Sequence, residues 1–557
     1  MCEGYVLPKT KAPASRPERL LLPKPKLASL VAASSRETTA ESPRPADYYP
    51  LVTPIPSFGF ELNEEDKWYF ALYRDQIAYE LSPYCQANFF SRTSLRDSMV
   101  NRCVHHSILS IGAYARALMD LHNEYPSGGN ASRTWWPQSV LNRHHQAALV
   151  HHAKALSHLR SNIGQYGIDS RVTMAATLLF IVFENMQGNY HSSGNLIRSG
   201  IKVLTNIRNK GSDPRSILRR QWHRYLTTPH DEVDEMTSMF ARHSVASAFI
   251  PLAHGKFAYH LLFTEDESDE MDYGLASPLT FTVPQTLEQA RQVWVYLAVQ
   301  LADFLSKAAW HNLHPEYESD GAAAYREQAM FLTLLSDLGM GLDSLLYTAA
   351  AAAIDSRQSQ RSLELLRLHH AVAVIATSCC LDPTEMAYDD FAPQFEDVVQ
   401  RCRLFSDDYY YPAQEASSST SSGSSKVGFT NEAGRLPLLA FVGAKCRRAR
   451  VRAAAVALLR SRADWREGSW DSSSLADAVA GLARLEGQGL DDDYDDYDDS
   501  AAVEGEGLRV SVPAKEDRHV WSNMFWDFER RQMHVEYTKV LPDAFGELET
   551  VSYVVGV

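Results

Sequence analysis

Residues 172–204 read VTMAATLLFIVFENMQGNYHSSGNLIRSGIKVL and decide the fold class. Apolar residues recur at steps of three and four on both sides of Gly188, which is the spacing of one helix face. Val172, Leu179 and Phe183 share the buried face of the first helix. The Gly-Asn turn then lets a second helix fold back antiparallel. This stretch predicts two packed helices.

The same helical period continues through most of the chain. Gly, Pro and polar clusters interrupt it, and alternation typical of strands appears only near the C-terminus. The pattern predicts helices at 63–80, 97–121, 141–163, 170–187, 191–208, 284–308, 325–353, 358–381, 388–404, 438–461 and 472–485, and short strands at 535–540 and 551–555. We therefore expect an all-α fold, an irregular multi-helix array without a regular solenoid repeat.

Composition places the chain among ordinary globular proteins. It has 557 residues, 45% of them hydrophobic, and a formal net charge of −15, which argues against gripping nucleic acid by overall charge. Seven scattered cysteines do not form a disulfide framework, so we expect a reducing compartment. We expect no membrane span, because the longest strongly apolar stretch, 172–183, is well short of the ~20 residues that a spanning helix needs. We expect no signal peptide, because Pro23 interrupts the only apolar run near the N-terminus, 20–22.

Two kinds of segment depart from the helical pattern. Residues 1–58 are rich in Pro, Ser, Lys and Arg, which predicts a disordered basic tail; it either contacts phosphates or an import receptor, or serves only as a linker. Residues 59–557 form the predicted helical domain, with flexible insertions near 412–430 and 487–510. The first contains the serine run 417–425, and the second contains the Asp/Tyr run 491–499.

Histidines at 144, 151 and 158, with a second pair at 145 and 152, suggest a metal site on one helix. Seven residues rise about 10.5 Å, which is too far for two imidazoles that share one ion. A structural role is therefore favoured. The helical wheel places Leu149, Ala153, Leu156, Leu159 and Ile163 on the buried stripe, His145 and His152 at its edge, and the other three histidines opposite.

Other chemical motifs are weak. Glycine-rich phosphate loops, the nucleophile elbow and the H-E-x-x-H zinc motif are absent from the sequence. Asp491, Asp492 and Asp495 have the D-D-x-x-D spacing of helical terpene synthases, yet glycine-rich flanks leave them without the rigid frame that Mg²⁺ requires. A basic helix face contains Lys445, Arg447, Arg448, Arg450 and Arg452; it is either solvated, paired with carboxylates, or in contact with nucleic acid.

Three segments in order resemble the regulatory domain of fungal-specific transcription factors, the zinc binuclear cluster (Zn2Cys6) regulators. The first is 149–204, with Phe183-Glu184 ending one helix and Gly188-Asn189-Tyr190 turning into the next. We interpret Glu184 as a hydrogen-bonded structural carboxylate. The second is 436–447, LPLLAFVGAKCR, and the third is 465–471, WREGSWD. The resemblance covers the chain from about residue 60 to the C-terminus.

The first residues, Met1-Cys2-Glu3-Gly4-Tyr5, resemble the end of that family's zinc cluster. Cys2 would then be the last ligand of a cluster whose other five cysteines are missing here. Two zinc ions need six thiolates, so we expect weak, non-specific DNA binding from this polypeptide and no cofactor in it, although zinc belongs to intact family members. A chance Cys-Glu-Gly-Tyr is the alternative.

The resemblance implies a nuclear, non-enzymatic effector domain that controls RNA polymerase II genes. Its expected partners are the transcriptional machinery or coregulators and a small-molecule effector, with DNA only if the zinc cluster lies upstream, and no membrane. The alternatives are a helical metal-dependent enzyme of terpene-synthase type and a non-DNA-binding scaffold derived from the same family.

Overall fold

The structure is a computed structural model that describes residues 62–84, 88–124, 142–166, 169–208, 232–248, 282–314, 320–352, 357–405, 428–462, 465–488, 512–527, 532–543 and 547–556. All of them belong to one compact unit, 55–557. The predicted tail, 1–58, and most of the two predicted insertions lie outside the described residues, so these expectations stay predictions.

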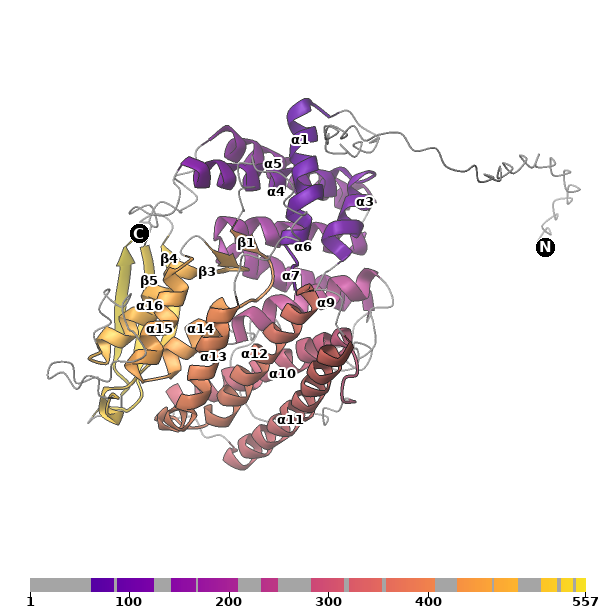
Figure 1. Ribbon diagram of the computed structural model, residues 1–557. Coiled ribbons are helices and arrows are strands. Elements are labelled where there is room, and N and C mark those ends of the chain that lie inside the picture. The colour runs from indigo at the N-terminus through magenta and orange to yellow at the C-terminus, as the bar shows by residue number, and fades with distance from the viewer. Residues whose placement is uncertain are drawn as a thin grey trace, which may run out of the picture. The chain divides into compact units, whose positions relative to one another are not determined.

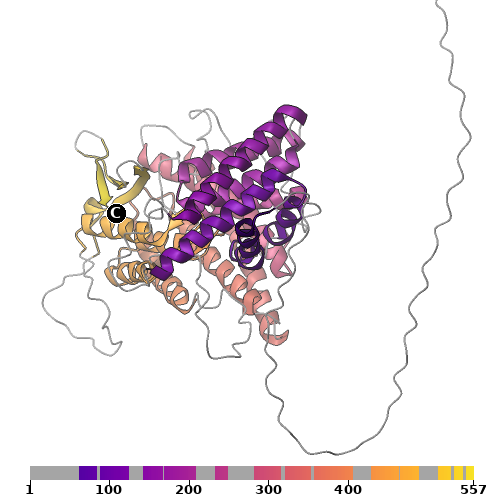
Figure 2. The same cartoon turned by 90° about the horizontal axis from the view of Figure 1, so that it is seen from above.

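Helices dominate the described part of the chain, which confirms the all-α prediction (Figure 1). The N-terminal helices pack around one core, and α4 and α5 lie side by side (Figure 2). In chain order they are α1 (Glu64–Leu72), a π-helical turn (Tyr73–Ile77), α2 (Ala78–Glu80), a second π-helical turn (Phe89–Thr93), α3 (Ser94–Ser98), α4 (Arg102–Glu124), α5 (Arg143–Tyr166), α6 (Ser170–Gln187), α7 (Tyr190–Arg208) and α9 (Glu232–Ala248).

The predicted hairpin of 172–204 is present as α6 and α7. Asp169 begins α6, because its side chain accepts hydrogen bonds from the backbone N–H groups of Arg171 and Val172. Gly188 ends it with a φ of 74°, a left-handed conformation that favours glycine. Both signals are local, which explains why the sequence predicted the bounds of α6 correctly.

The remaining helices pack around a second, larger core. They are α10 (Leu287–Leu313), α11 (Gly321–Ala352), α12 (Arg357–Cys379), a 3-10 turn (Met386–Phe391), α13 (Ala392–Leu404), α14 (Leu436–Lys445), α15 (Ala449–Arg460) and α16 (Ser472–Leu485). The helix predicted over 438–461 is wrong as one element, since the backbone is extended at Cys446 and Arg448 and separates α14 from α15. The helix predicted over 97–121 is likewise divided between α3 and α4.

Two small sheets complete the unit. In one, β1 (Phe429–Thr430) pairs in parallel with β2 (Arg466–Glu467), which pairs antiparallel with β3 (Trp470–Asp471). The other is antiparallel in the order β4 (His519–Asp527), β5 (Gln532–Lys539), β6 (Thr550–Gly556), and follows a 3-10 turn (Lys515–Asp517). The two predicted C-terminal strands are present as β5 and β6. Tyr537 on β5 donates to the carbonyl of Ala478, which anchors this sheet on α16.

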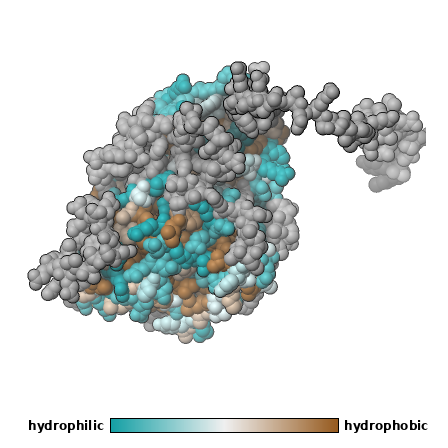
Figure 3. Space-filling view, viewed as in Figure 1, coloured by the Kyte–Doolittle hydropathy of each residue, from teal (hydrophilic) through white to brown (hydrophobic). Residues whose placement is uncertain are grey.

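Helix α11 bears on the expectation that no segment spans a membrane, because it is a longer apolar stretch than 172–183. Its segment Gly321–Tyr347 is long and apolar enough to span a bilayer, and 33% of its most apolar stretch is buried. Buried Phe331, Leu335, Leu338 and Leu342 join it to the core that includes α10 and α12. A core helix passes the same test of length and composition, so this observation is weak ground for a span. On the face shown in Figure 3, apolar residues lie among hydrophilic ones.

Candidate functional site

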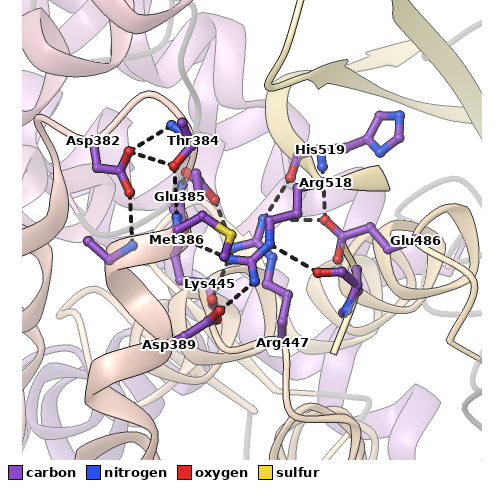
Figure 4. Close-up of polar contacts among 12 residues, drawn as sticks. Asp382, Thr384, Glu385, Met386, Asp389, Lys445, Arg447, Glu486, Arg518 and His519 are labelled. Atoms are coloured by element: carbon purple, nitrogen blue, oxygen red, sulfur yellow. Dashed lines mark hydrogen bonds and ion pairs between the residues drawn. The ribbon is translucent and has the colours of Figure 1, made fainter. Parts of the chain in front are cut away.

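The basic stretch after α14 forms a buried ion network (Figure 4). The side chains of Arg447 and Arg452 are fully buried, and both pair with Glu486 at the end of α16. The Arg447 Nη2–Glu486 Oε1 distance is 3.3 Å, and the Arg452 Nη1–Glu486 Oε2 distance is 2.8 Å. Burial raises the pKa of Glu486, but the two guanidinium groups outweigh it and hold the pKa below its usual value.

Glu385 supplies a second carboxylate from the turn before the 3-10 segment. Its Oε2 lies 2.7 Å from Nη1 of Arg447, and its other oxygen pairs with Lys445. Among the described residues Glu385 alone combines a side chain with a positive φ, 56°. Such a backbone is held only where surrounding contacts compensate for its strain. The two ion pairs and the Arg518 contact to its carbonyl provide them.

The network also holds the start of the C-terminal sheet. Arg518 donates to the carbonyl of Glu385 at 2.8 Å and pairs with Asp389 at 2.5 Å. The backbone N–H of His519 donates to Glu486 at 2.9 Å. Four segments far apart in the sequence therefore meet at one set of buried charges: the 382–391 turn, the α14–α15 break, the end of α16 and the start of β4.

These contacts decide between the three interpretations of the basic face. Lys445, Arg447 and Arg452 are buried and paired with carboxylates, whereas Arg448 and Arg450 are exposed. The three buried members cannot reach a phosphate, so nucleic-acid contact through this face stays a prediction only for the exposed Arg448 and Arg450. The carboxylate-paired interpretation is confirmed for the buried members.

The orientation predicted for the histidine helix is also wrong. His144, His145 and His151 on α5 are buried, whereas Leu149 and Ile163 are 44% and 37% exposed. The reason is the tertiary partner, since α5 packs along α4 and presents its imidazoles to that interface. A helical wheel built on apolar residues alone cannot anticipate this.

Hydrogen bonds hold the histidine cluster together. His106 of α4 faces His151 with 3.1 Å between their Nδ1 atoms, and Nε2 of His151 lies 3.1 Å from Asp66. Tyr69 is 2.7 Å from Nδ1 of His144. Burial lowers the pKa of His106 to about 4, so its ring is neutral at physiological pH. In the described part of the chain, no group of three or more His, Cys, Asp or Glu side chains is arranged to hold a metal ion.

The described cysteines are poor nucleophiles. Cys103, Cys379, Cys380, Cys402 and Cys446 are all buried free thiols. Burial raises the pKa of Cys103 and of Cys402 to about 12, so these thiols stay protonated.

Comparison with known proteins gives one family. Residues 69–265 match the family model described as fungal specific transcription factor domain. The family resemblance is confirmed over these residues, which include the first of the three resembling segments. The match begins within α1 and includes the α6–α7 hairpin and α9. No curated protein and no solved structure matches the chain.

The WREGSWD segment lies outside the matched residues of the fungal transcription factor family but contacts them. Ser469 donates to Asn185 Oδ1 at 2.8 Å, and Arg466 reaches the Asn185 carbonyl at the end of α6. Asp471 begins α16 by accepting from the backbone N–H of Ser474 at 2.8 Å. The motif therefore ties the α6–α7 turn of the matched segment to the C-terminal helices.

Glu467 is the central residue of this motif. Its buried carboxylate accepts hydrogen bonds from the backbone N–H groups of Gly434, Arg435 and Leu436, at 2.8, 3.1 and 2.9 Å, and from the indole of Trp465. Glu467, on β2, therefore accepts hydrogen bonds from backbone N–H groups at the start of α14 that have no partner within the helix. Burial raises its pKa to about 7, although all four donors oppose the shift.

The remaining sequence predictions have mixed outcomes. Glu184 accepts from Asn189 at 2.7 Å, which confirms that this carboxylate is hydrogen-bonded, and its structural role stays a prediction. Cys2, the serine run and the acidic run with Asp491, Asp492 and Asp495 lie outside the described residues. The zinc-ligand assignment and the disfavoured terpene-synthase motif therefore stay untested.

Proposed function

We propose that this chain is the effector part of a fungal transcription regulator that acts in the nucleus on RNA polymerase II genes. The observation that carries the proposal is the family match over 69–265. In this proposal the helical unit responds to coregulator proteins or a small molecule and catalyses no reaction. The zinc cluster suggested by Cys2 is the part that would read DNA.

The buried charges support this interpretation over an enzyme. Arg447, Arg452 and Glu486 are fully buried and paired with one another, so they hold segments together instead of facing a substrate. An active site instead gathers titratable groups around a space open to substrate. No observation among the described residues favours the terpene-synthase or scaffold alternative over the regulator.

Tethering tests the function directly. Residues 1–557 fused to an unrelated DNA-binding domain should change transcription of a reporter that carries the matching sites, upward or downward, relative to the DNA-binding domain alone. A fusion carrying Glu516→Gln, an exposed position, should behave like the unchanged fusion. A stable, nuclear fusion that leaves the reporter unchanged in several fungal hosts would contradict the proposal.

DNA binding requires a separate measurement. In a gel-shift at physiological salt the purified chain should bind weakly, without sequence preference, and lose binding steeply as salt rises. Tight, sequence-selective binding would contradict the expectation that this chain lacks a complete zinc cluster. Zinc analysis of the same sample provides the control.

A further inference from the structure

An open pocket lies where the family-matched segment meets the second core. Its volume is about 550 Å³, including the space at its mouth. Its lining comes from α9, α10, α12, the chain after α2 and the chain after β1: Tyr84, Arg242, Arg291, Trp294, Val295, Ser362, Leu365, Leu366, His369, Glu432 and Ala433.

Hydrogen bonds fix the pocket wall that is formed by the segment after α2 and the segment after β1. Glu432 accepts from the Ser82 hydroxyl and from the backbone N–H of Tyr84, at 2.5 and 2.8 Å. Ser362 of α12 donates to the carbonyl of Tyr84 at 2.6 Å. The backbone N–H of Asn431 donates to the Leu81 carbonyl at 3.1 Å. The pocket is therefore preformed by segments distant in sequence, not a gap between two loose loops.

Most of the lining is apolar, but its charges are not balanced. Two guanidinium groups, Arg242 and Arg291, face the pocket with one carboxylate, Glu432, which lies 3.5 Å from Arg242. Burial lowers the pKa of His369 to about 4, which keeps this ring neutral. The lining thus has an excess positive charge.

Arg291 is the polar group that lacks a full set of partners. Its side chain is only 12% exposed, and its contact with Glu288, 40% exposed, is long at 3.3 Å. Its Nε is buried and has no acceptor within the described residues. A buried guanidinium N–H without an acceptor is costly, and a carboxylate is the planar, bidentate group that matches it.

We propose that this pocket binds a small monocarboxylate whose aromatic or aliphatic body packs against Trp294, Val295 and Leu365 while its carboxylate accepts from Arg291. Arg242 is paired with Glu432, so Arg291 is the guanidinium group that would receive the ligand, and a single guanidinium group favours a monoanion over a phosphate or a dianion. The proposal concerns binding and does not depend on the proposed function, so a negative reporter assay leaves it intact.

Titration of the full purified chain tests the site. Cinnamate, hydrocinnamate and octanoate are added in turn, with intrinsic tryptophan fluorescence and calorimetry as readouts, beside the neutral amide of each acid. At least one acid should bind saturably, and its amide should bind roughly tenfold or more weakly, because the charge-assisted hydrogen bonds are lost. Absence of saturable binding by all three acids, or equal binding of acid and amide, overturns the proposal.

Variants locate the binding. Arg291→Met keeps the aliphatic stem and should weaken acid binding roughly tenfold or more while leaving amide binding little changed. Arg326→Gln on α11, whose side chain is 72% exposed, is the matched control and should bind like the unchanged chain. Circular dichroism shows whether each variant is folded. Unchanged acid affinity in folded Arg291→Met overturns the proposal, and the acid–amide comparison decides the charge requirement even if this variant fails to fold.

Discussion

Glu486→Gln tests whether the buried ion network holds the fold together. The substitution keeps the size of the side chain but removes the charge that faces Arg447 and Arg452, both fully buried. Arg447 keeps its pair with Glu385 at 2.7 Å. Arg452 keeps the Gly443 carbonyl and the amide oxygen of Gln488 but loses its paired carboxylate.

The expected cost is large because one guanidinium group is left charged, buried and without a counter-ion. Breaking a buried ion pair from one side destabilises by about 3–5 kcal/mol. In a unit of this size unfolding entropy is large, so the same loss lowers Tm by only about 3–5 °C if the unit unfolds as one. Urea denaturation followed by circular dichroism is therefore the better measure of the free energy of unfolding.

Hydrogen exchange adds a local readout. Glu486 accepts from the N–H of His519, so amides at the start of β4 should exchange faster in the variant. Glu516→Gln, at an exposed position three residues earlier, should stay within about 0.5 kcal/mol of the unchanged chain. In a double-mutant cycle with Arg452→Met, the double variant should lose less stability than the sum of the two single variants. A folded Glu486→Gln protein within 1 kcal/mol of the unchanged chain by the same measurement, or additive effects in the cycle, would refute this account.

Three further predictions follow from other contacts. Burial holds the pKa of His106 at about 4, below its unfolded value near 6.5, so the neutral ring stabilises the fold above about pH 6.5 and this contribution is lost as pH falls toward 4. His106→Gln should lose less free energy of unfolding between pH 7 and pH 5 than the unchanged chain, by about 1–2 kcal/mol in urea melts, and an equal loss in both proteins would contradict this account. Gly188→Ala should destabilise the fold by about 1–3 kcal/mol, because φ is positive and the new Cβ would lie 2.5 Å from the Arg466 guanidinium. The control, Gly194→Ala on α7, places its Cβ in open space and should be neutral or stabilising by up to about 1 kcal/mol. Equal Tm shifts of the two variants would contradict the argument that Gly188 ends α6. Glu467→Ala should cost about 2–4 kcal/mol in thermal unfolding, since four donors lose their acceptor, and a smaller change than that of Gly188→Ala would count against its central role.

The sequence predicted those features whose causes are local. The α6–α7 hairpin has its signals at Asp169 and Gly188, within a few residues of the helix ends they determine. The break between α14 and α15 has no such signal, because the partners of Arg447 are Glu385 and Glu486, distant along the chain. The apolar periodicity continues across this break, so the sequence alone predicted a single helix over 438–461.

Two other errors have the same origin in tertiary structure. The apolar stripe on α5 predicted that the side of the helix with Leu149 is buried. In the structure α4 packs against the histidine side of α5, where His106 contacts His151, and Leu149 is exposed. Strand β4 was not predicted, although the segment contains buried Trp521 and Met524. A register shift between Trp521 and Asn523 breaks the alternation by which strands are recognised.

The segment after β1 joins the pocket to the structural motif, and this determines which residue can test ligand binding. Glu432 lines the pocket and holds Ser82 and Tyr84, while Gly434, two residues later, is held by Glu467 at the start of α14. A substitution of Glu432 would therefore disturb both the pocket wall and the position of this helix, so a loss of binding would have two explanations. Arg291 lies on a different element, α10, and its described ion pair is with Glu288 on its own helix. Loss of acid binding in a folded Arg291 variant can therefore be assigned to the pocket itself.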